Sequence, residues 1–464
     1  MAMLDALIDG LGPAVSTDPA DLEAARTDRS GWTTPERPLA VVRARSTADV
    51  QAVLRLATAH RTPVVPRGSG TGLAGGAVAS EGSVVLDLSG MDRVLAVDVD
   101  DETAVVEPGV ITDALAEHLR PLGLWWPPDP ASRAISSVGG NIATNAGGLL
   151  CAKYGVTRQS VLALAVVLAD GGLVRLGGAT VKDVTGYDLT GLMIGSEGTL
   201  GVVVEATLRL RRLDPHPPVT LAATFDSVVQ AAAAAAAITA TGLRPAALEI
   251  MDAASCAAVD ALVAAGEGPE GDLPSLAGRG AFLLVRTDGA GAEAETATAV
   301  RLIEAEGGNV SRAPDERAGE ALLALRRSAH AAFARLGEVL IEDVAVPRSA
   351  LPQMFAAIEG IAARHGLPIP TIAHAGDGNL HPNVVIPASM PHAPGEIPEA
   401  VWAVGDEVFR AALALGGALT GEHGVGVLKR RWLADAVGED VLALSRRVKA
   451  AFDPLGVLNP GKAI

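Results

Sequence analysis

The sequence predicts an α+β protein with two main domains, and three observations lead to this prediction. In the first half, strand and helix signals alternate and are separated by glycine-rich loops. At residues 216–219 (HPPV), a proline-containing linker interrupts this pattern. Beyond it, alanine-rich helices alternate with short strands such as residues 281–287 (AFLLVRT), which is typical of an antiparallel sheet covered by helices. A chain of 464 residues is long enough for roughly two or three such domains.

The elements of the first half follow from capping residues and valine-rich runs. After an initial helical segment, Ser46 or Thr47 can cap a helix over about residues 48–59. A second helix is predicted at residues 111–119. The predicted strands share runs of β-branched and aliphatic residues bounded by turn residues. They lie at residues 62–68, 84–90, 161–177 (a hairpin turned at Asp170 and Gly171) and 199–212.

The second half is predicted to contain a helix around the alanine run 231–237 and a strand signal at residues 339–347. The tail of the chain has a loop-like composition. These patterns predict four parts: an N-terminal helical segment, a first domain, a second domain and a C-terminal segment. Their predicted bounds are residues 1–34, 35–215, 216–450 and 451–464.

Composition excludes several classes of function. The formal net charge is −17 and aromatic residues make up 3%, so the basic surface that binds nucleic acid is missing. No apolar run approaches the ~20 residues of a membrane span. The first ten residues lack the cationic and apolar regions of a signal peptide. Two cysteines, Cys151 and Cys256, form no disulfide framework. We therefore expect a cytoplasmic protein that contacts membranes, if at all, through a partner.

The first glycine-rich loop, residues 66–77 (PRGSGTGLAGGA), contains a GxGxxG pattern that begins at Gly70. A Rossmann dinucleotide site would require a crossover helix after this pattern, but the next strand begins near Val84. Asp87 comes too early, and Asp92 lies past the strand, so neither matches the acidic residue of that fold. The pattern instead predicts a nest of backbone N–H groups that binds a diphosphate.

Residues 374–383 (HAGDGNLHPN) carry two histidines on either side of a turn. Asp-Gly dipeptides favour two-residue hairpin loops, and a loop at Asp377 and Gly378 would place His374 directly opposite His381. The β-carbons of directly opposed residues lie about 4.5–5.5 Å apart. Two imidazoles at that separation can share one divalent ion, so the spacing predicts a metal site.

A second motif, residues 421–426 (GEHGVG), can complete this site. Glu422 would supply an anionic third ligand and leave a fourth position for substrate oxygen. His423 follows it as a candidate catalytic base. Asn383 lies two residues beyond His381 and is expected to point toward the same ion. Packing of ordinary turn histidines would not explain why these polar groups gather in glycine-flanked loops.

Seven motifs together indicate a family. The sequence resembles the flavoproteins of the vanillyl-alcohol oxidase and p-cresol methylhydroxylase (PCMH) superfamily. Within it, the resemblance is to glycolate oxidase flavin subunits, D-lactate dehydrogenases and D-2-hydroxyglutarate dehydrogenases, and it covers nearly the whole chain. The motifs are TDRSGW (27–32), PRGSGTGLAGG (66–76), GGNIATNAGG (139–148), GSEGTLG (195–201), HAGDGNLH (374–381), GEHGVG (421–426) and LNPGK (458–462).

The resemblance implies a PCMH-type FAD-binding domain of two subdomains, an α+β cap domain with an antiparallel sheet, and a C-terminal segment that returns to the first domain. It implies dissociable FAD, because residues 66–72 contain neither His nor Cys, although Cys151 lies close to the loops in the sequence. The implied FAD contacts are Pro66, Arg67, Gly68, Ser69, Gly70, Thr71, Gly72, Pro128, Asp129, Ser137, Gly140, Asn141, Thr144, Asn145, Gly147, Glu197, Gly198, Thr199, Val203 and Asn459.

The resemblance also assigns chemistry to single residues. His423 matches the family's base, and Arg326 matches its carboxylate-binding arginine. Arg327 is the alternative, since adjacent helix residues point about 100° apart and only one can face the pocket. His330 is interpreted either as a substrate-pocket residue or as a partly buried helix residue. The expected metal at His374, His381 and Glu422 is zinc or manganese.

These assignments imply an FAD- and metal-dependent dehydrogenase that oxidises a small 2-hydroxy acid and passes electrons to an acceptor protein or a quinone-linked partner subunit. The hydroxyglutarate branch is expected to have Thr in place of His330 and Lys in place of Ile341, so glycolate or D-lactate is favoured. Three alternatives remain. They are a D-2-hydroxyglutarate-type dehydrogenase, an FAD-binding subunit of a multi-subunit glycolate oxidase, and a metallohydrolase without flavin.

Overall fold

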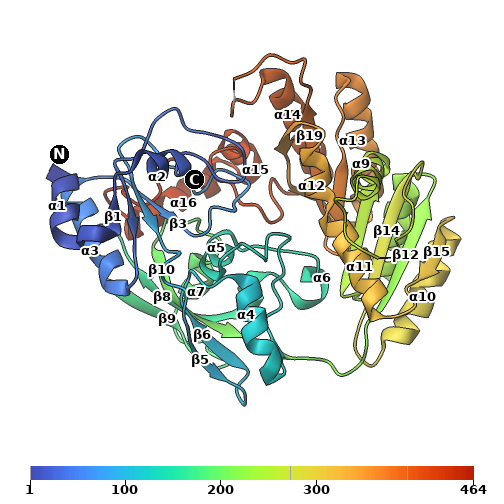
Figure 1. The fold of residues 1–464 in the computed structure, drawn as a ribbon, viewed down its shortest axis with the longest axis horizontal. Helices are drawn as coiled ribbons and strands as arrows, with labels where there is room; N and C mark the ends of the chain where they lie inside the picture. The colour runs from blue at the N-terminus through green and yellow to red at the C-terminus, as the bar shows by residue number, and fades with distance from the viewer. Residues whose placement is uncertain (1, 272, 394) are drawn as a thin grey trace. The chain divides into compact units, whose positions relative to one another are not determined.

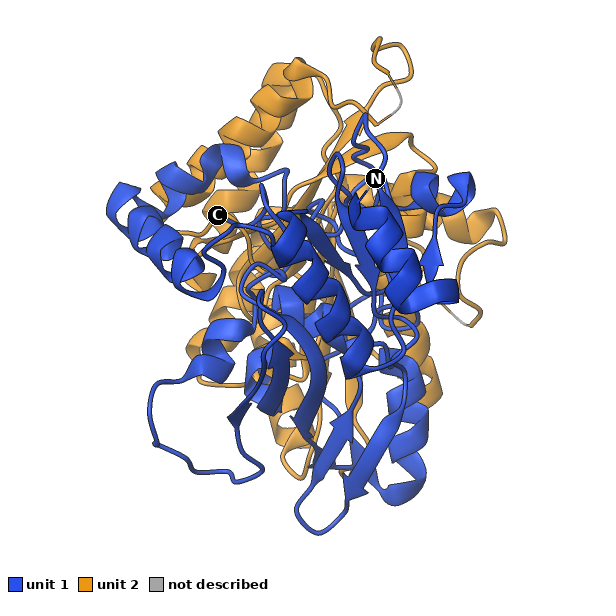
Figure 2. Ribbon diagram, turned by 90° about the vertical axis from the view of Figure 1, so that its left-hand side faces the viewer, with its two compact units in different colours: residues 1–147, 155–213, 422–464 blue, residues 148–154, 214–421 orange. Residues whose placement is uncertain are grey.

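The chain folds into two compact units, which are coloured separately in Figure 2. The computed structural model describes residues 2–271, 273–393 and 395–464. Unit 1 comprises residues 1–147, 155–213 and 422–464, and unit 2 comprises residues 148–154 and 214–421. This division differs from the predicted bounds at three places. The N-terminal helical segment is part of unit 1, residues 148–154 join unit 2, and the return to unit 1 starts at residue 422 instead of 451.

Unit 1 contains two main sheets (Figure 1). The first has the order β1-β2-β4-β3, in which β2, β4 and β3 are parallel. The second is antiparallel with the order β5-β6-β10-β8-β9, and the short strands β7 and β11 pair separately. The bounds are β1 Val15–Ser16, β2 Ala40–Arg43, β3 Val64–Arg67, β4 Val84–Asp87, β5 Val94–Asp98, β6 Thr103–Val106, β7 Leu124–Trp125, β8 Val161–Val167, β9 Leu173–Gly177, β10 Val202–Arg209 and β11 Arg211–Arg212.

The helices of unit 1 cover these sheets. The helix predicted around residues 48–59 is α3, and the hydroxyl of its N-cap residue Ser46 accepts from the Asp49 N–H. Buried Leu7 of α1 and Val50 and Leu54 of α3 pack in one core with the first sheet. The helix bounds are α1 Ala2–Leu11, α2 Pro19–Ala24, α3 Thr47–His60, α4 Thr112–Leu119, α5 Val138–Thr144, α7 Leu189–Met193, α15 Leu433–Val437 and α16 Glu439–Phe452.

The glycine loop connects β3 to β4 without a helix: residues 68–83, all of them described, form only turns, bends and irregular chain. Gly70 and Gly75 have φ angles of +68° and +76°, values that glycine adopts without strain. The expectation that this loop is not a Rossmann crossover therefore agrees with the structure.

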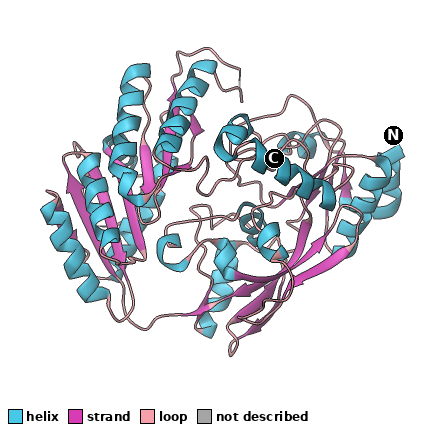
Figure 3. Cartoon of the chain, turned by 180° about the vertical axis from the view of Figure 1, so that it is seen from behind, coloured by secondary structure: helices cyan, strands magenta, loops and turns pink. Residues whose placement is uncertain are grey.

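Unit 2 is built on one antiparallel sheet with the order β15-β12-β14-β13-β18-β19-β16, and β17 pairs with β19. Helices lie on both faces of this sheet (Figure 3). The strands are β12 Val219–Phe225, β13 Ala247–Asp252, β14 Ala281–Thr287, β15 Asn309–Arg312, β16 Glu338–Ile341, β17 Val344–Ala345, β18 Thr371–His374 and β19 Asn379–Ile386. The helices are α6 Cys151–Tyr154, α8 Val228–Ala240, α9 Ala253–Ala264, α10 Ala292–Ala305, α11 Glu316–Arg327, α12 Ala329–Ala334, α13 Leu351–His365 and α14 Glu399–Ala414.

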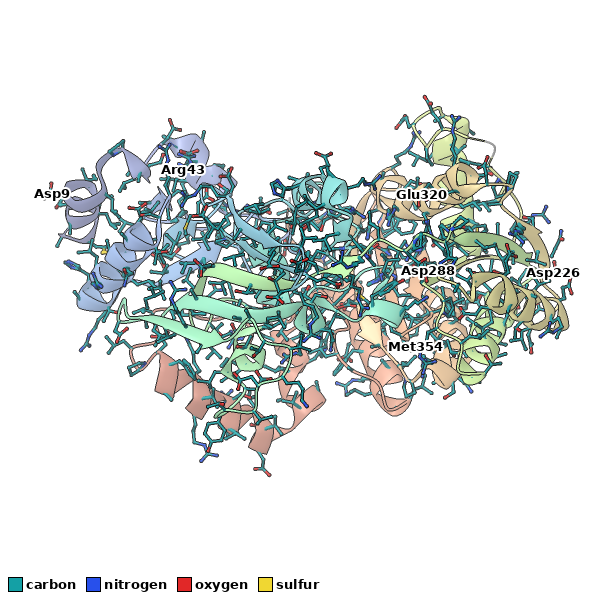
Figure 4. The ribbon with its side chains drawn as sticks, turned by 90° about the horizontal axis from the view of Figure 1, so that it is seen from below. Asp9, Arg43, Asp226, Asp288, Glu320 and Met354 are labelled. Carbon is teal, nitrogen blue, oxygen red and sulfur yellow. The ribbon has the colours of Figure 1, made fainter. Side chains whose placement is uncertain are left out.

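Residues 148–154 belong to unit 2 because their side chains contact it. Leu149 is buried in a core that contains residues of α9, α11 and α12. The Tyr154 hydroxyl donates to Asp288 Oδ2 at 2.6 Å, and Lys153 forms an ion pair with the same carboxylate, which is labelled in Figure 4. Residues 148–154 are thus part of unit 2, although the residues before and after them in the sequence belong to unit 1.

Gly378→Ala is expected to destabilise unit 2 strongly. The residue has a φ of +89°, and an added β-carbon would lie 2.1 Å from the Val346 carbonyl oxygen. The strain and the required backbone shift should cost on the order of 3 kcal/mol. Gly366→Ala is the matched control, because that residue also has a positive φ (+64°) but has open space around it. Thermal unfolding should show a much larger decrease in Tm for Gly378→Ala, and equal decreases would contradict the steric argument.

Candidate active site

Arg67 braces the glycine loop from inside unit 1. Its Nη1 donates to the carbonyl oxygens of Thr27 at 2.9 Å and Ala77 at 3.0 Å. Gly70 has a φ of +68°, and a β-carbon on it would lie 2.3 Å from Nη2 of Arg67, so a larger residue would strain the backbone and displace the guanidinium. Burial lowers the pKa of the guanidinium, with Asp28 acting in the opposite direction. The side chain of Arg67 therefore shapes the loop, and backbone groups of the loop remain for the predicted diphosphate contacts.

Glu197 holds the loop that carries His423. It is buried, and its carboxylate accepts from the N–H groups of Val425 at 2.7 Å and Gly426 at 2.8 Å. Burial raises the pKa of Glu197, while these two hydrogen bonds oppose the increase. Two motifs more than two hundred positions apart in the sequence are thereby fixed to each other within unit 1.

Asn459 joins two of the predicted FAD-contacting segments. Its Nδ2 donates to the carbonyl oxygens of Gly76 at 3.0 Å and Glu197 at 2.7 Å. Its Oδ1 accepts from Lys462 Nζ at 3.1 Å. Lys462 is buried, and burial lowers its pKa to about 8. Sequence reasoning missed Lys462, although it lies in the quoted motif LNPGK, and it also missed the buried Asp28.

The other predicted FAD contacts of the asparagine-rich motif surround α5. Ser137 is the N-cap of α5, and its hydroxyl accepts from Gly140 N–H at 3.3 Å. A β-carbon on Gly68 would lie 2.6 Å from Ser137 Oγ, so the glycine loop packs closely on this helix start. The side chains of Asn141 and Thr144 bond to protein groups, namely the Thr112 hydroxyl and the Gly140 carbonyl. Backbone atoms at these glycines are the surface that a flat cofactor can approach.

The remaining predicted contacts lie in loops or on β10. Asn145 has a φ of +54°, and its Oδ1 accepts from the Arg158 N–H. Asp129 and Thr199 are buried, and Val203 is a half-buried residue of β10. A β-carbon on Gly147 would lie 2.4 Å from Glu422 Oε2, so the Glu422 side chain packs directly on that backbone within unit 1.

In unit 2, His374 and His381 lie close together, but not in the predicted register. His374 is paired with Asn379, and His381 is paired with Ile372. The prediction of a two-residue loop was wrong, because residues 375–378 form a four-residue turn. The register is shifted by two residues, which keeps both histidines on the same face. They are therefore diagonal neighbours, and their ring centroids are 5.1 Å apart.

Each of these histidines contacts a buried carboxylate that the sequence did not indicate. His374 Nδ1 lies 2.9 Å from both oxygens of Glu249, on the neighbouring strand β13. His381 Nδ1 lies 3.6 Å from Asp343 Oδ1. Asp343 also accepts from Asn379 Nδ2 and from the Gly421 N–H. Gly421 is the last residue of unit 2, so the contact fixes the backbone directly before Glu422 and His423.

Three predicted substrate residues belong to the same unit. Arg326 is 3% exposed, and its Nη2 pairs with Glu249 Oε2 at 2.9 Å, whereas Arg327 is half-buried. The Asn383 amide donates to the Pro370 and His381 carbonyls, and among the described residues its Oδ1 has no hydrogen-bond donor. His330 is half-buried and packs edge-on against Phe333. The structure thus separates Arg326 from Arg327 by burial.

Known families match most of the chain. Residues 38–177 match an FAD binding domain, and residues 215–463 match the C-terminal domain of FAD linked oxidases. The chain belongs to the FAD-linked oxidases. This membership confirms the predicted FAD cofactor and oxidoreductase class, and the glycine backbone of unit 1 fits a flat cofactor. Among the described residues of this FAD-linked oxidase, no helix is long and apolar enough to cross a membrane.

Named relatives and solved structures agree with this membership. The chain is 40% identical to glycolate oxidase subunit GlcD of Bacillus subtilis (strain 168), over 95% of this chain and 93% of that protein. It is 38% identical to D-2-hydroxyglutarate dehydrogenase of Xanthomonas citri pv. viticola (97% and 93% covered). It is 35% identical to D-lactate dehydrogenase of Anaerostipes hadrus (92% and 89% covered). A structure of p-cresol methylhydroxylase matches with a TM-score of 0.78 at 17% identity, covering 100% of this chain and 96% of that one, which confirms the predicted PCMH-type fold.

Asn459→Gly is expected to weaken FAD binding by up to about thirtyfold. The variant keeps the positive φ of residue 459 but removes the two hydrogen bonds to Gly76 and Glu197, each of which contributes about 1 kcal/mol. Titration of the apoprotein with FAD, followed by flavin fluorescence, measures the change. Asn309→Gly, at an exposed position of unit 2, is the control and should bind FAD like the wild type. Unchanged FAD affinity in Asn459→Gly would show that FAD binding does not depend on these two hydrogen bonds.

Proposed function

We propose that the protein is an FAD- and divalent-metal-dependent dehydrogenase that oxidises a small 2-hydroxy acid to the 2-oxo acid. The observation that carries this proposal is one face of the unit 2 sheet, where two imidazoles and one guanidinium meet buried carboxylates. Such a set of groups suits a metal ion together with an anionic substrate. Relatives named as a glycolate oxidase subunit and as a D-lactate dehydrogenase support the substrate class.

We propose His374, His381 and Glu422 as the metal ligands. The Nδ1 atoms of both histidines face carboxylates, so each ring would bind the metal through Nε2. Glu422 directly follows Gly421 in the chain, and the Gly421 N–H donates to Asp343, whose Oδ1 lies 3.6 Å from His381 Nδ1. Two imidazoles and one carboxylate suit a catalytic zinc site, and manganese accepts the same donors. When bound, the metal would supply Lewis-acid assistance at the substrate hydroxyl.

The chain's own residues have separate tasks in this proposal. His423 takes the hydroxyl proton as the general base. Arg326 binds the substrate carboxylate; its five N–H donors allow this in addition to the Glu249 pair. Asn383 and His330 line the substrate site. FAD, when bound, supplies the electron acceptor for the hydride that leaves the α-carbon of the substrate.

Small monocarboxylates are the favoured substrates. Ile341 lies directly opposite Asn383 in the β16–β19 register and offers no charge for a second carboxylate. A panel of 2-hydroxy acids with an artificial dye acceptor tests this directly. We expect glycolate or D-lactate to give a higher kcat/KM than D-2-hydroxyglutarate. The opposite order would favour the alternative that the 38% identical D-2-hydroxyglutarate dehydrogenase supports.

We further propose that electrons leave through an acceptor protein or a quinone-linked partner subunit. The word "subunit" in the name of the glycolate oxidase relatives supports a multi-subunit assembly. In a second version of this proposal, the chain is the FAD-binding subunit of such an assembly. The cytoplasmic location proposed from cysteine usage is supported by Cys151 and Cys256, which are both buried free thiols.

Removal of the metal is expected to abolish turnover and leave the flavin bound. The reason is that two of the three proposed ligands, His374 and His381, lie in unit 2, whereas the glycine loops that fit FAD lie in unit 1. A chelator and the variant His381→Ala should act alike, and added zinc or manganese should restore only the chelated wild type. Flavin absorbance and dye reduction are measured together. Near-normal activity after either treatment would make the ion structural or absent.

His423→Ala should reduce its flavin with substrate about 10²–10⁴-fold more slowly, because a general base is lost. Arg326→Lys should mainly raise KM, since an ammonium cannot reproduce the bidentate contact of a guanidinium. Rapid mixing of each variant with substrate under anaerobic conditions measures flavin reduction directly. Unchanged reduction in His423→Ala would remove this residue from the mechanism.

A further inference from the structure

Glu249 is a charged residue in the middle of an otherwise apolar environment. All six residues of β13 are buried. Ala247 and Met251, which flank Glu249 on the same face of the strand, pack in a core with Leu325 and Phe333. Glu249 itself is 1% exposed. A carboxylate at such a position is costly to bury unless donors or cations pair with it, so its partners account for its presence.

The partners of Glu249 are two groups of the proposed active site. Its carboxylate faces His374 directly across the β13–β18 ladder, with both oxygens 2.9 Å from Nδ1. Arg326, from α11, approaches the same carboxylate at 2.9 Å. These contacts turn the Nδ1 edge of the His374 ring toward Glu249. The opposite edge of the ring then presents Nε2 as the metal-binding atom.

We propose that Arg326, Glu249 and His374 form a buried relay in which Glu249 is a positioning residue for the metal. Glu249 fixes the orientation of the His374 ring, and Arg326 holds the Glu249 carboxylate in place. The inference rests on the proposed function, and it adds a consequence. The arginine proposed to bind substrate also controls metal affinity, although it is not a ligand.

Asp343 has a similar place beside His381, but its role is divided. The distance from Asp343 Oδ1 to His381 Nδ1 is longer, at 3.6 Å. The Asp343 carboxylate also accepts from Asn379 Nδ2 and from the Gly421 N–H. Changing Asp343 would therefore alter loop structure together with the histidine. Glu249 has no such backbone contact among the described residues and is the cleaner position for an experiment.

The test measures zinc affinity of the FAD-loaded enzyme by competition with a chromophoric chelator. Loss of a carboxylate behind a metal-binding histidine typically lowers metal affinity 10–100-fold. We expect a decrease of at least about tenfold in Glu249→Gln, which retains the shape but loses the charge. Arg326→Gln should also weaken zinc binding, whereas Arg326→Lys, which keeps a cation beside Glu249, should retain most of the affinity. The last comparison separates the relay from a general loss of packing.

Asp252→Asn is the matched control. Asp252 is a buried carboxylate on the same strand, but it accepts from the N–H groups of Ser255 and Thr371 and so has a structural role. The Asp252→Asn substitution should lower Tm and leave zinc affinity unchanged. If Glu249→Gln fails to fold, Glu249→Asp replaces it, since its carboxylate is one methylene too short to reach His374 and should also weaken zinc binding.

The possible outcomes distinguish failure of the relay from failure of the proposed function. If the wild type binds zinc and Glu249→Gln binds it with the same affinity, the relay is overturned and the proposed function stays intact. A wild type that binds no zinc, and whose activity survives chelation, overturns the metal part of the function and the relay with it. Weakened zinc binding in Asp252→Asn equal to that in Glu249→Gln would show that the effect is only structural, and would also overturn the relay.

Discussion

Burying a carboxylate in a protein is costly unless donors or a cation pair with it, and both units of this FAD-linked oxidase meet that constraint with functional segments. In unit 1, Glu197 is paired with the backbone of the loop that carries His423. In unit 2, Glu249 is paired with His374 and Arg326, and Asp343 with the chain directly before Glu422. The groups that compensate each buried charge thus include the residues that we propose for the chemistry, or lie directly beside them in the chain, and their positions follow from the same interactions that stabilise the fold.

The two units present different kinds of groups. In unit 1, glycines at residues 68, 70 and 147 each lie where a β-carbon would meet another atom within 3 Å. In unit 2, the antiparallel sheet places Glu249, His374 and His381 on one face at fixed register. A backbone surface suits a flat cofactor, whereas converging imidazole and guanidinium groups suit a metal and an anion.

Much of the fold could be predicted from the sequence because the relevant signals are local. Each of these signals lies within a short stretch of sequence. Examples are the capping residue Ser46, the valine-rich strands and the short connection after Gly76, and the structure agrees with all three. The unit boundaries were harder. Residues 148–154 join unit 2 through Leu149, Lys153 and Tyr154, and no local pattern indicates which distant carboxylate or core a short segment will contact.

The candidate site also combines local signals that the sequence reveals with long-range contacts that it does not. The sequence by itself determined which residue types are available: the glycines of the loops, the histidines of two glycine-flanked motifs and one arginine of an adjacent pair. Only the tertiary structure decided that His374 pairs with Asn379 instead of His381, and that Glu249, Asp343, Asn459 and Lys462 connect the motifs. The physical reason is that hydrogen-bond register and charge pairing depend on distances between strands and loops far apart in the chain, whereas a sequence pattern reports only the preferences of neighbouring residues.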